Sequence, residues 1–260
     1  EFYRQWLDSS MLYSSAIFDD TTKTLETAQL RKLDRIAEKL QLTGGESVLE
    51  IGCGWGALAI HLATHSGSNV TGITLSPSQL QWATSAVVKA EKTASIDLRL
   101  QDYRDVNGQF DRIVSIEMFE AVGEAYWPSY FEALKRCLKP GGRAVLQIIS
   151  IDEDRFDTYR RKADFIQKYV FPGGFLPSDS ALEKAVGKAG MKLTDKELFG
   201  QSYARTLADW RHRFHAKWQT ISLLGFDERF RRLWDYYLCY CEAGFIEGTI
   251  NVGFYTIEHP

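Results

Sequence analysis

The sequence predicts an α/β protein with a mostly parallel sheet that helices cover on both faces. Predicted strands and helices alternate through the first half of the chain, which is the pattern of such a sheet. One apolar strand also runs directly into a glycine-rich turn and then into a helix, at residues 48–63. Because sheets of this kind bind ligands at the carboxyl ends of their strands, we expect a binding site at that edge.

The expected elements follow in order from the amino end. Apolar or alternating runs predict strands at 48–51, 69–74, 96–101, 110–116 and 143–149. Helices are expected at 57–63 and 78–92, and a third helix ends at the turn Pro140-Gly141-Gly142. The carboxyl ends of the strands then bring four segments to one rim: Glu50 to Gly56, Thr74 to Ser76, Gln101 to Tyr103, and Ser115 to Glu120.

The glycine-rich turn has the spacing G-x-G-x-G at residues 52–56. Glycine lets the backbone approach a ligand that a Cβ atom would exclude. The turn lacks the third glycine of a dinucleotide fingerprint, and no Lys-Ser or Lys-Thr pair follows to hold a triphosphate. The pattern favours a nucleoside without phosphate, S-adenosylmethionine, over an ordinary strand-to-helix turn. With the order of elements, it resembles the class I methyltransferase fold.

Composition agrees with one compact enzyme. The 260 residues are 45% hydrophobic, which is ample for a core, and the net charge of −3 gives no general attraction to nucleic acid. No apolar run approaches 18 residues and no signal peptide is apparent, so no membrane span is expected. Cys53, Cys137, Cys239 and Cys241 show no C-x-x-C spacing and are expected to be reduced thiols of a cytoplasmic protein.

We expect a single domain over residues 1–260. An amino-terminal lid takes up 1–45, the core 46–150, and a helical insertion with a carboxyl-terminal lipid-binding part 151–260. The chain starts inside an expected helix, Glu1 to Leu7, which leaves room for residues ahead of it. The second half adds a charged helical stretch at 152–169 and an aromatic helical region at 203–245.

The aromatic region allows two interpretations. Trp210, Phe214 and Trp218 fall at i, i+4 and i+8, and 226–241 continues the stripe, so these rings pack on the sheet or line a pocket for an acyl chain. Burial of roughly 0.8 kcal/mol per CH₂ would hold such a chain. Residues 201–240 also carry seven basic groups against four acidic ones. That run is a solvated face, or a surface for anionic lipid headgroups or an acidic carrier protein.

Six short motifs follow one another along the chain. They are Y-S-S-A at 13–16, L-E-I-G-C-G-W-G at 49–56, Q-D-Y-R-D at 101–105, F-E-A-V-G at 119–123, K-Y-V-F-P-G-G at 168–174 and Y-Y-L at 236–238. Together they resemble the cyclopropane-fatty-acyl-phospholipid synthase family, which includes the mycolic acid cyclopropane synthases. The resemblance runs from about Asp8 to the end of the chain. Larger bacterial members have an additional amino-terminal domain, which the sequence as given does not include.

The resemblance implies a class I S-adenosylmethionine-dependent methyltransferase, Rossmann-like, with a mixed, mostly parallel seven-stranded sheet and helical additions that form an acyl pocket. It also implies transfer of a methylene group to the cis double bond of an unsaturated fatty acyl chain. An alkene is a weak nucleophile, so the enzyme must hold it against the sulfonium methyl. The carbocation that follows needs a dry, aromatic pocket. A bound bicarbonate is the implied base whose action closes the cyclopropane ring.

The resemblance places the catalytic site on six residues: Glu120, Tyr203, Gln147, Ser15, Ile149 and Cys241. Ser15 stands where the family has a cysteine and Gln147 where it has a histidine, but both can donate hydrogen bonds to an anion. F-E-A-V-G also resembles plant-type members. The alternative for Glu120 is a buried carboxylate paired with an arginine. For Cys241 it is an inert buried thiol, since the chemistry needs no covalent step.

Rim position and resemblance together indicate the cofactor site, and no metal is expected. The residues are Tyr13, Ser14, Glu50, Gly52, Gly54, Gly56, Thr74, Leu75, Gln79, Gln101, Asp102 and Tyr103. Tyr13 and Ser14 are expected to close over the sulfonium from the lid. Thr74 and its neighbours should hold the ribose, and Asp102 and its neighbours should lie near the adenine.

The leading interpretation is therefore cyclopropane formation on an acyl chain. A hydride shift, or proton loss elsewhere, would instead give a methyl-branched or methylene-bearing chain. A third possibility, a non-catalytic homologue that binds lipid or cofactor, is disfavoured because Glu120 and the glycine turn are intact. The expected partners are unsaturated phospholipid acyl chains at a membrane surface, so the protein should be cytoplasmic and peripherally membrane-associated. No nucleic acid partner is expected, and the sequence leaves a homo-oligomer open.

Overall fold

A computed structural model describes all 260 residues and has a seven-stranded sheet of order β3-β2-β1-β4-β5-β7-β6. Its strands are β1 (Ser47–Ile51), β2 (Asn69–Thr74), β3 (Ile96–Leu100), β4 (Phe110–Ile116), β5 (Leu138–Ile151), β6 (Lys192–Leu198) and β7 (Ile250–Glu258). Strands β1 to β5 pair in parallel, and β7 is antiparallel to both β5 and β6. The predicted fold class, with its mixed and mostly parallel sheet, is confirmed.

Ten α-helices accompany the sheet. They are α1 (Leu25–Leu40), α2 (Ala57–His65), α3 (Pro77–Lys89), α4 (Trp127–Cys137), α5 (Glu153–Tyr159), α6 (Phe165–Tyr169), α7 (Asp179–Lys188), α8 (Gly200–Ala216), α9 (Trp218–Ser222) and α10 (Glu228–Ile246). Side chains cap several amino ends: Thr24 begins α1 with a capping box, and Ser76 accepts from the Gln79 amide before Pro77 begins α3. No helix is both long and apolar enough to cross a membrane.

Alternating side chains of each strand pack on the two faces of the sheet. Leu49 and Ile113 belong to a core beneath α4 and α7, whereas their neighbours Val48 and Val114 belong to a core beneath α1, α2 and α3. Both faces are thus buried, and the carboxyl edge is left for ligands.

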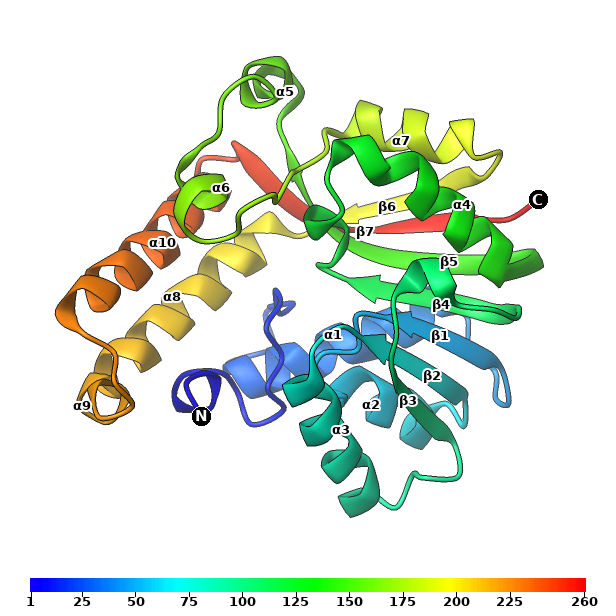
Figure 1. Ribbon diagram of the computed structural model, residues 1–260, viewed down its shortest axis with the longest axis horizontal. Coiled ribbons are helices and arrows are strands. Elements are labelled where there is room, and N and C mark those ends of the chain that lie inside the picture. The colour runs from blue at the N-terminus through cyan, green and yellow to red at the C-terminus, as the bar shows by residue number, and fades with distance from the viewer.

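Helices α8 and α10 lie side by side and extend away from the sheet, as Figure 1 shows. Together with the amino-terminal segment they form a third core, in which Trp6, Trp210 and Phe214 are fully buried. Trp210 and Phe214 are therefore packed in a core, as one interpretation of the aromatic stripe expects, but not mainly against the sheet. This core joins the lid to α8 and α10, and Val252 of β7 is its only buried residue from the sheet.

Three expected elements differ in the structure. Residues 1–7 form only a 3-10 turn, Tyr3–Gln5, and the charged stretch at 152–169 breaks into α5 and α6 because Asp164 starts a new helix with its own capping box. The Pro-Gly-Gly turn lies inside β5. There the pairing with β4 jumps from Leu138 to Arg143, and the Gly141 amide of the turn donates instead to the carbonyl of His259, the residue after β7.

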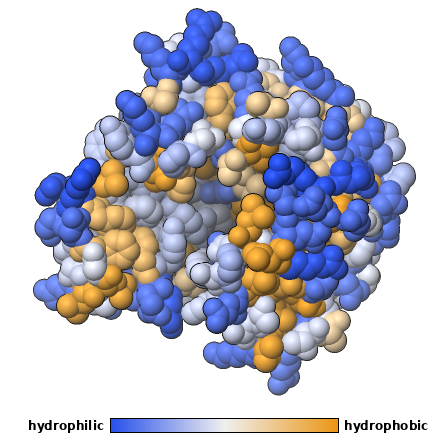
Figure 2. All heavy atoms as spheres, in the orientation of Figure 1, coloured by the Kyte–Doolittle hydropathy of each residue, from blue (hydrophilic) through white to orange (hydrophobic).

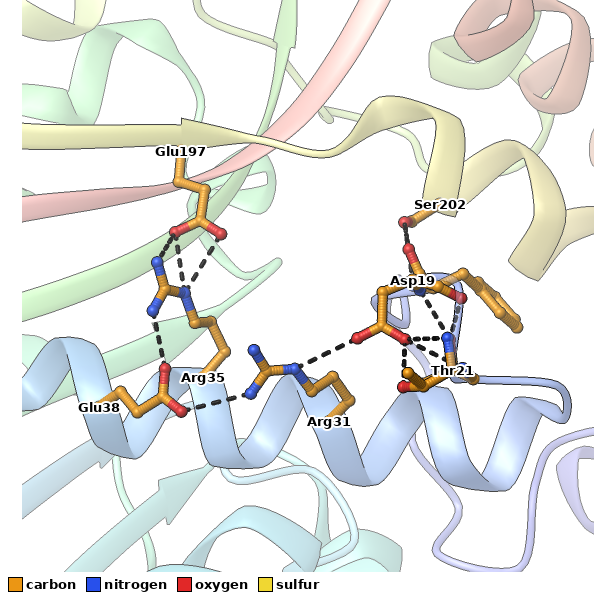
Figure 3. A network of polar contacts seen from close by, with 9 residues as sticks. Asp19, Thr21, Arg31, Arg35, Glu38, Glu197 and Ser202 are labelled. Carbon is orange, nitrogen blue, oxygen red and sulfur yellow. Dashed lines mark hydrogen bonds and ion pairs between the residues drawn. The ribbon is translucent and has the colours of Figure 1, made fainter.

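Polar contacts attach the lid to the body of the protein (Figure 3). Arg35 on α1, within the lid, pairs with Glu197 on β6 at 2.7 Å, and inside the lid Arg31 of α1 pairs with Asp19 at 3.6 Å. The Phe18 amide donates to Ser202 on α8 at 3.0 Å. Each exposed ion pair contributes little alone, but the set fixes the path of the lid toward the carboxyl edge.

Candidate active site

A cavity of about 740 Å³ opens at the carboxyl ends of β1 to β4, between the sheet and the lid. Eleven of the twelve predicted cofactor residues line it: Tyr13, Ser14, Glu50, Gly52, Gly54, Thr74, Leu75, Gln79, Gln101, Asp102 and Tyr103. The exception is Gly56. The segments that the sequence places at one rim are therefore brought together around a single cavity.

The glycines of the turn have different roles. Gly54 has φ +51°, and a Cβ atom built on it would meet nothing within 4 Å, so its open side is free for a ligand. A Cβ on Gly56 would lie 2.9 Å from the Cβ of Ala83. Gly56 was predicted as a cofactor residue, but it does not line the cofactor cavity. Its missing side chain instead lets α2 begin close to α3.

The cavity has polar groups suited to the parts of a nucleoside with an amino-acid tail. Thr74 donates to Oε1 of Gln79 at 2.7 Å at the end of β2, and Asp102 pairs with Arg104 at 2.7 Å after β3. Leu75 between them is 71% exposed, which is unusual for leucine and offers an apolar face to a flat ring.

Glu50 gives the cavity a buried carboxyl group that needs a partner. Its Oε2 atom has no hydrogen bond in the structure, and burial raises the pKa of this carboxyl to about 8. A positively charged ammonium group of a ligand would satisfy it. S-adenosylmethionine therefore fits this site, with the open side of Gly54 beside it.

A second cavity, of about 1170 Å³, lies between the carboxyl ends of the strands and the helices of the second half of the chain, α5, α6, α8 and α10. Figure 2 shows the molecule hollowed in the middle of this face. Apolar and aromatic side chains from α6, α8 and α10 form much of its wall, among them Ile166, Leu207 and Phe245. Its size and lining suit a long hydrocarbon chain. Tyr13, Glu117 and Ala121 line both cavities and mark where they meet.

Glu117 is the functional residue that sequence reasoning missed. It follows β4, lies half-buried where the two cavities meet, and has φ +48°, a backbone conformation that glutamate rarely adopts. Its Oε1 accepts from the Ser15 amide at 2.8 Å and from Nε2 of Gln147 at 2.6 Å. Its Oε2 accepts from the Tyr203 hydroxyl at 2.6 Å. The sequence did contain a signal for this residue, since S-I-E-M-F-E at 115–120 places two carboxylates three residues apart at the end of a strand.

Three of the predicted anion-binding residues therefore gather around Glu117. Gln147 and Tyr203 donate their side-chain hydrogens to it. Ser15 donates its backbone amide, while its hydroxyl turns away to the Ala16 carbonyl at 3.0 Å. Ser15 and Gln147 line neither of the two cavities. Bicarbonate as a cofactor stays a prediction.

Glu120 lines the second cavity with Ile149. The Ile149 amide donates to its Oε1 at 2.6 Å, and its buried Oε2 has no partner, so the arginine pairing considered from sequence does not occur. Burial, and then the charge of Glu117, raise the pKa of Glu120 to about 8. Because the charge of Glu117 acts on Glu120, the two carboxyls do not both ionise readily: the three donors and Lys32 favour ionised Glu117, and Glu120 keeps its proton.

Three tyrosines and one thiol complete the wall of the second cavity near the point where the two cavities meet. Tyr13 and Tyr237 join their hydroxyls at 2.9 Å, and Tyr13, Tyr203 and Tyr237 all border the second cavity. Cys241 also lines it, and burial raises the pKa of its thiol to about 12. The thiol is therefore protonated at neutral pH and forms part of an apolar wall.

The sheet topology and the cavity at its carboxyl edge define a class I S-adenosylmethionine-dependent methyltransferase. Residues 1–254 match the family profile described as mycolic acid cyclopropane synthetase. The chain belongs to that family. The resemblance drawn from the six sequence motifs is thereby confirmed.

Similar proteins agree with this assignment. A tuberculostearic acid methyltransferase of Mycobacterium tuberculosis is 40% identical over 99% of this chain and 62% of its own length. The cyclopropane-fatty-acyl-phospholipid synthase of Escherichia coli K12 is 39% identical over 94% of this chain and 61% of its own length. The mycolic acid cyclopropane synthase CmaA1, complexed with SAH and CTAB, superposes with a TM-score of 0.92 at 30% identity, covering 98% of this chain and 93% of that one.

The chain spans less than two thirds of the length of these two curated relatives, 62% and 61%. The activity, substrates and partners of the whole protein are therefore a matter for proposal.

Proposed function

We propose that the protein transfers a methyl group from S-adenosylmethionine to the double bond of an unsaturated fatty acyl chain, and that Glu117 then takes a proton from that methyl group so that a cyclopropane ring closes. The observation that carries this proposal is the position of Glu117. It lines both the cofactor cavity and the larger apolar cavity, where a methyl group would pass from one to the other.

Different residues of the chain have different roles in this reaction. S-adenosylmethionine, when bound, supplies an electrophilic methyl group. The apolar wall excludes water from the cation that forms on the chain, and the rings of Tyr13 and Tyr203 with the charge of Glu117 stabilise it. Glu117 is fixed by three donors before the reaction starts, so no reorganisation is needed when charge develops.

This proposal gives Glu117 the role that the family resemblance gives to bicarbonate. The donors on Ser15, Gln147 and Tyr203 already hold a carboxylate that is part of the chain. A second anion at the same donors would be repelled by Glu117 unless one of the two were protonated. Wild-type turnover should therefore not depend on added bicarbonate.

Glu117→Gln and Glu117→Gly test the role of this carboxylate, with turnover measured on vesicles of monounsaturated phospholipid. A positioned base contributes a factor of roughly 10² to 10⁴, so Glu117→Gln should lose turnover of that order while S-adenosylhomocysteine still binds. Glu117→Gly frees the three donors and relieves the left-handed backbone, so bicarbonate should partly restore its turnover. An active Glu117→Gln with a bicarbonate-dependent wild type would refute the proposal.

The product itself needs a separate measurement. Ring closure and a shifted methylene group both add one CH₂, so mass alone does not distinguish them. Ozonolysis cleaves the methylene product and leaves the cyclopropane intact. Cleavage of the chains that have gained CH₂ would assign the protein to the methylene alternative, with Glu117 taking the methyl proton after a hydride shift.

We further propose that substrate chains enter from an anionic membrane surface. Tyr169, Tyr236 and Tyr240 are 61%, 53% and 41% exposed, and their rings surround that of Phe165. Tyr240 also lines the second cavity, and tyrosine favours the boundary between lipid and water. The charge contribution is smaller than the sequence suggested. Arg211 and Arg213 form ion pairs with Glu242 and Glu26.

Co-sedimentation with vesicles tests this surface. A Tyr169→Ser, Tyr236→Ser double variant should sediment less with vesicles than wild type does, with an unchanged melting temperature. High salt should weaken sedimentation only in part, because Arg211, Arg213 and Arg231 are already paired with carboxylates of the chain. Equal and negligible sedimentation of wild type with anionic and neutral vesicles would favour an acyl group on a carrier protein.

A further inference from the structure

A buried lysine lies at one end of the cofactor cavity without an acidic partner. Lys32 on α1 is fully buried and lines that cavity. Its Nζ donates to Oγ of Ser14 at 2.7 Å, and no carboxylate oxygen lies within 4.0 Å of it. A buried ammonium that is neither paired nor fully hydrogen-bonded is costly, so its retention calls for a reason.

Ser14 shares this incomplete set of hydrogen bonds. Helix α1 holds it from two sides, since Gln29 donates to its carbonyl at 2.9 Å and Lys32 donates to its hydroxyl oxygen. The structure gives the Ser14 hydroxyl hydrogen no acceptor, and the side chain lines the cofactor cavity. Lys32 and Ser14 thus offer only donors on this side, which suits an anionic oxygen group.

Glu50 presents the opposite chemistry in the same cavity. Its buried Oε2 lacks a donor, so this wall has one acceptor in need of a cation beside donors in need of an anion. The amino-acid tail of S-adenosylmethionine carries one ammonium and one carboxylate on the same carbon. We propose that Ser14 binds the carboxylate of this tail directly and that Lys32 supplies the positive charge behind it, while Glu50 receives the ammonium.

The other charges around Lys32 define the competing role. Glu117, Asp8 and Glu50 are the acidic groups that act on it, and burial lowers the pKa of Lys32 to about 8. A lysine that only balanced the charge of Glu117 would affect turnover, not recognition of the cofactor tail. The proposal rests on the cofactor and does not depend on the acyl substrate or its product.

Calorimetry without lipid separates these roles, using S-adenosylmethionine and its decarboxylated form, which differ by one carboxylate. Lys32→Met should bind S-adenosylmethionine roughly 10- to 100-fold more weakly, the range expected for a hydrogen bond to a charged group, and should bind the decarboxylated form as wild type does. Ser14→Ala should show the same preference to a smaller degree. Wild type should itself favour the carboxylated form.

Lys39→Met is the matched control, because Lys39 lies on the same helix but pairs with Asp195 and Glu197 away from the cavity. It should lower the melting temperature without distinguishing the two ligands. Equal weakening of both ligands by Lys32→Met and Ser14→Ala would overturn the proposal. Normal cofactor binding with lost turnover in Lys32→Met would assign the lysine to Glu117 instead. A wild type that binds neither ligand would refute the cofactor itself.

Discussion

The Tyr203 hydroxyl donates to Oε2 of Glu117 over 2.6 Å and joins α8 to the carboxyl end of β4. The helical addition therefore does more than wall a cavity, since it places a donor on a carboxylate of the core. Burial raises the pKa of Glu117, and the bond from Tyr203 opposes that rise. The state of charge at the junction of the two cavities depends on this contact.

Tyr203→Phe should shift the pH dependence of turnover. Losing a hydrogen bond to a charged group removes roughly 1.5–3 kcal/mol of stabilisation from the ionised form, so the pKa of Glu117 should rise further. Glu117 must be ionised to act as a base, so the acidic limb of the pH profile of kcat should move to higher pH. Tyr237→Phe, which loses a bond to Tyr13 and none to Glu117, is the control whose acidic limb should stay in place.

Glu120 should make the stability of the free protein fall as pH rises. Its pKa is raised from 4.5 to about 8 by burial and by Glu117, so the folded state holds a proton that the unfolded chain releases. This contribution is fully present below pH 4.5 and is lost as pH rises through about 8. Glu120→Gln stays neutral throughout, so its melting temperature relative to wild type should increase between these values. A constant difference would contradict the raised pKa.

The rim of the cofactor site was predictable because local sequence determines it. The carboxyl ends of parallel strands lie at the same edge of a sheet in any strand order. Thr74, Asp102 and Glu50 could therefore be placed together from the strand assignments alone. Glu117 could not be recognised in this way. Two of its donors come from Ser15 and Tyr203, which are 102 and 86 residues away in the chain, and no local sequence pattern predicts that they meet at Glu117.

Gly56 shows the reverse limit. A glycine pattern predicts that another group approaches the backbone closely, but it does not show whether that group is a ligand or a neighbouring helix. For Gly54 the open side faces the cavity, whereas for Gly56 it faces Ala83 on a helix that begins 21 residues later. The break between α5 and α6 was missed because a charged stretch conceals a local capping box at Asp164.

The two glycines should respond differently to substitution. Gly54→Val should abolish binding of S-adenosylhomocysteine, because the side chain would enter the cavity. Gly56→Val should mainly lower the melting temperature, because its Cβ would lie 2.9 Å from Ala83. Ala83→Gly should recover part of the stability lost in Gly56→Ala, although the φ of +88° leaves some strain. Normal ligand binding by Gly54→Val would place the cofactor site elsewhere.

Cys241 should matter for its volume and not for its thiol. Because burial raises the pKa of this thiol to about 12, almost no thiolate exists at neutral pH, and Cys241→Ala should keep most of the turnover on vesicles. Cys241→Trp should fill part of the second cavity and depress turnover on long acyl chains, while S-adenosylhomocysteine binds as before, since Cys241 lies outside the cofactor cavity. Loss of turnover in Cys241→Ala with normal cofactor binding would instead show that the thiol takes part in the reaction.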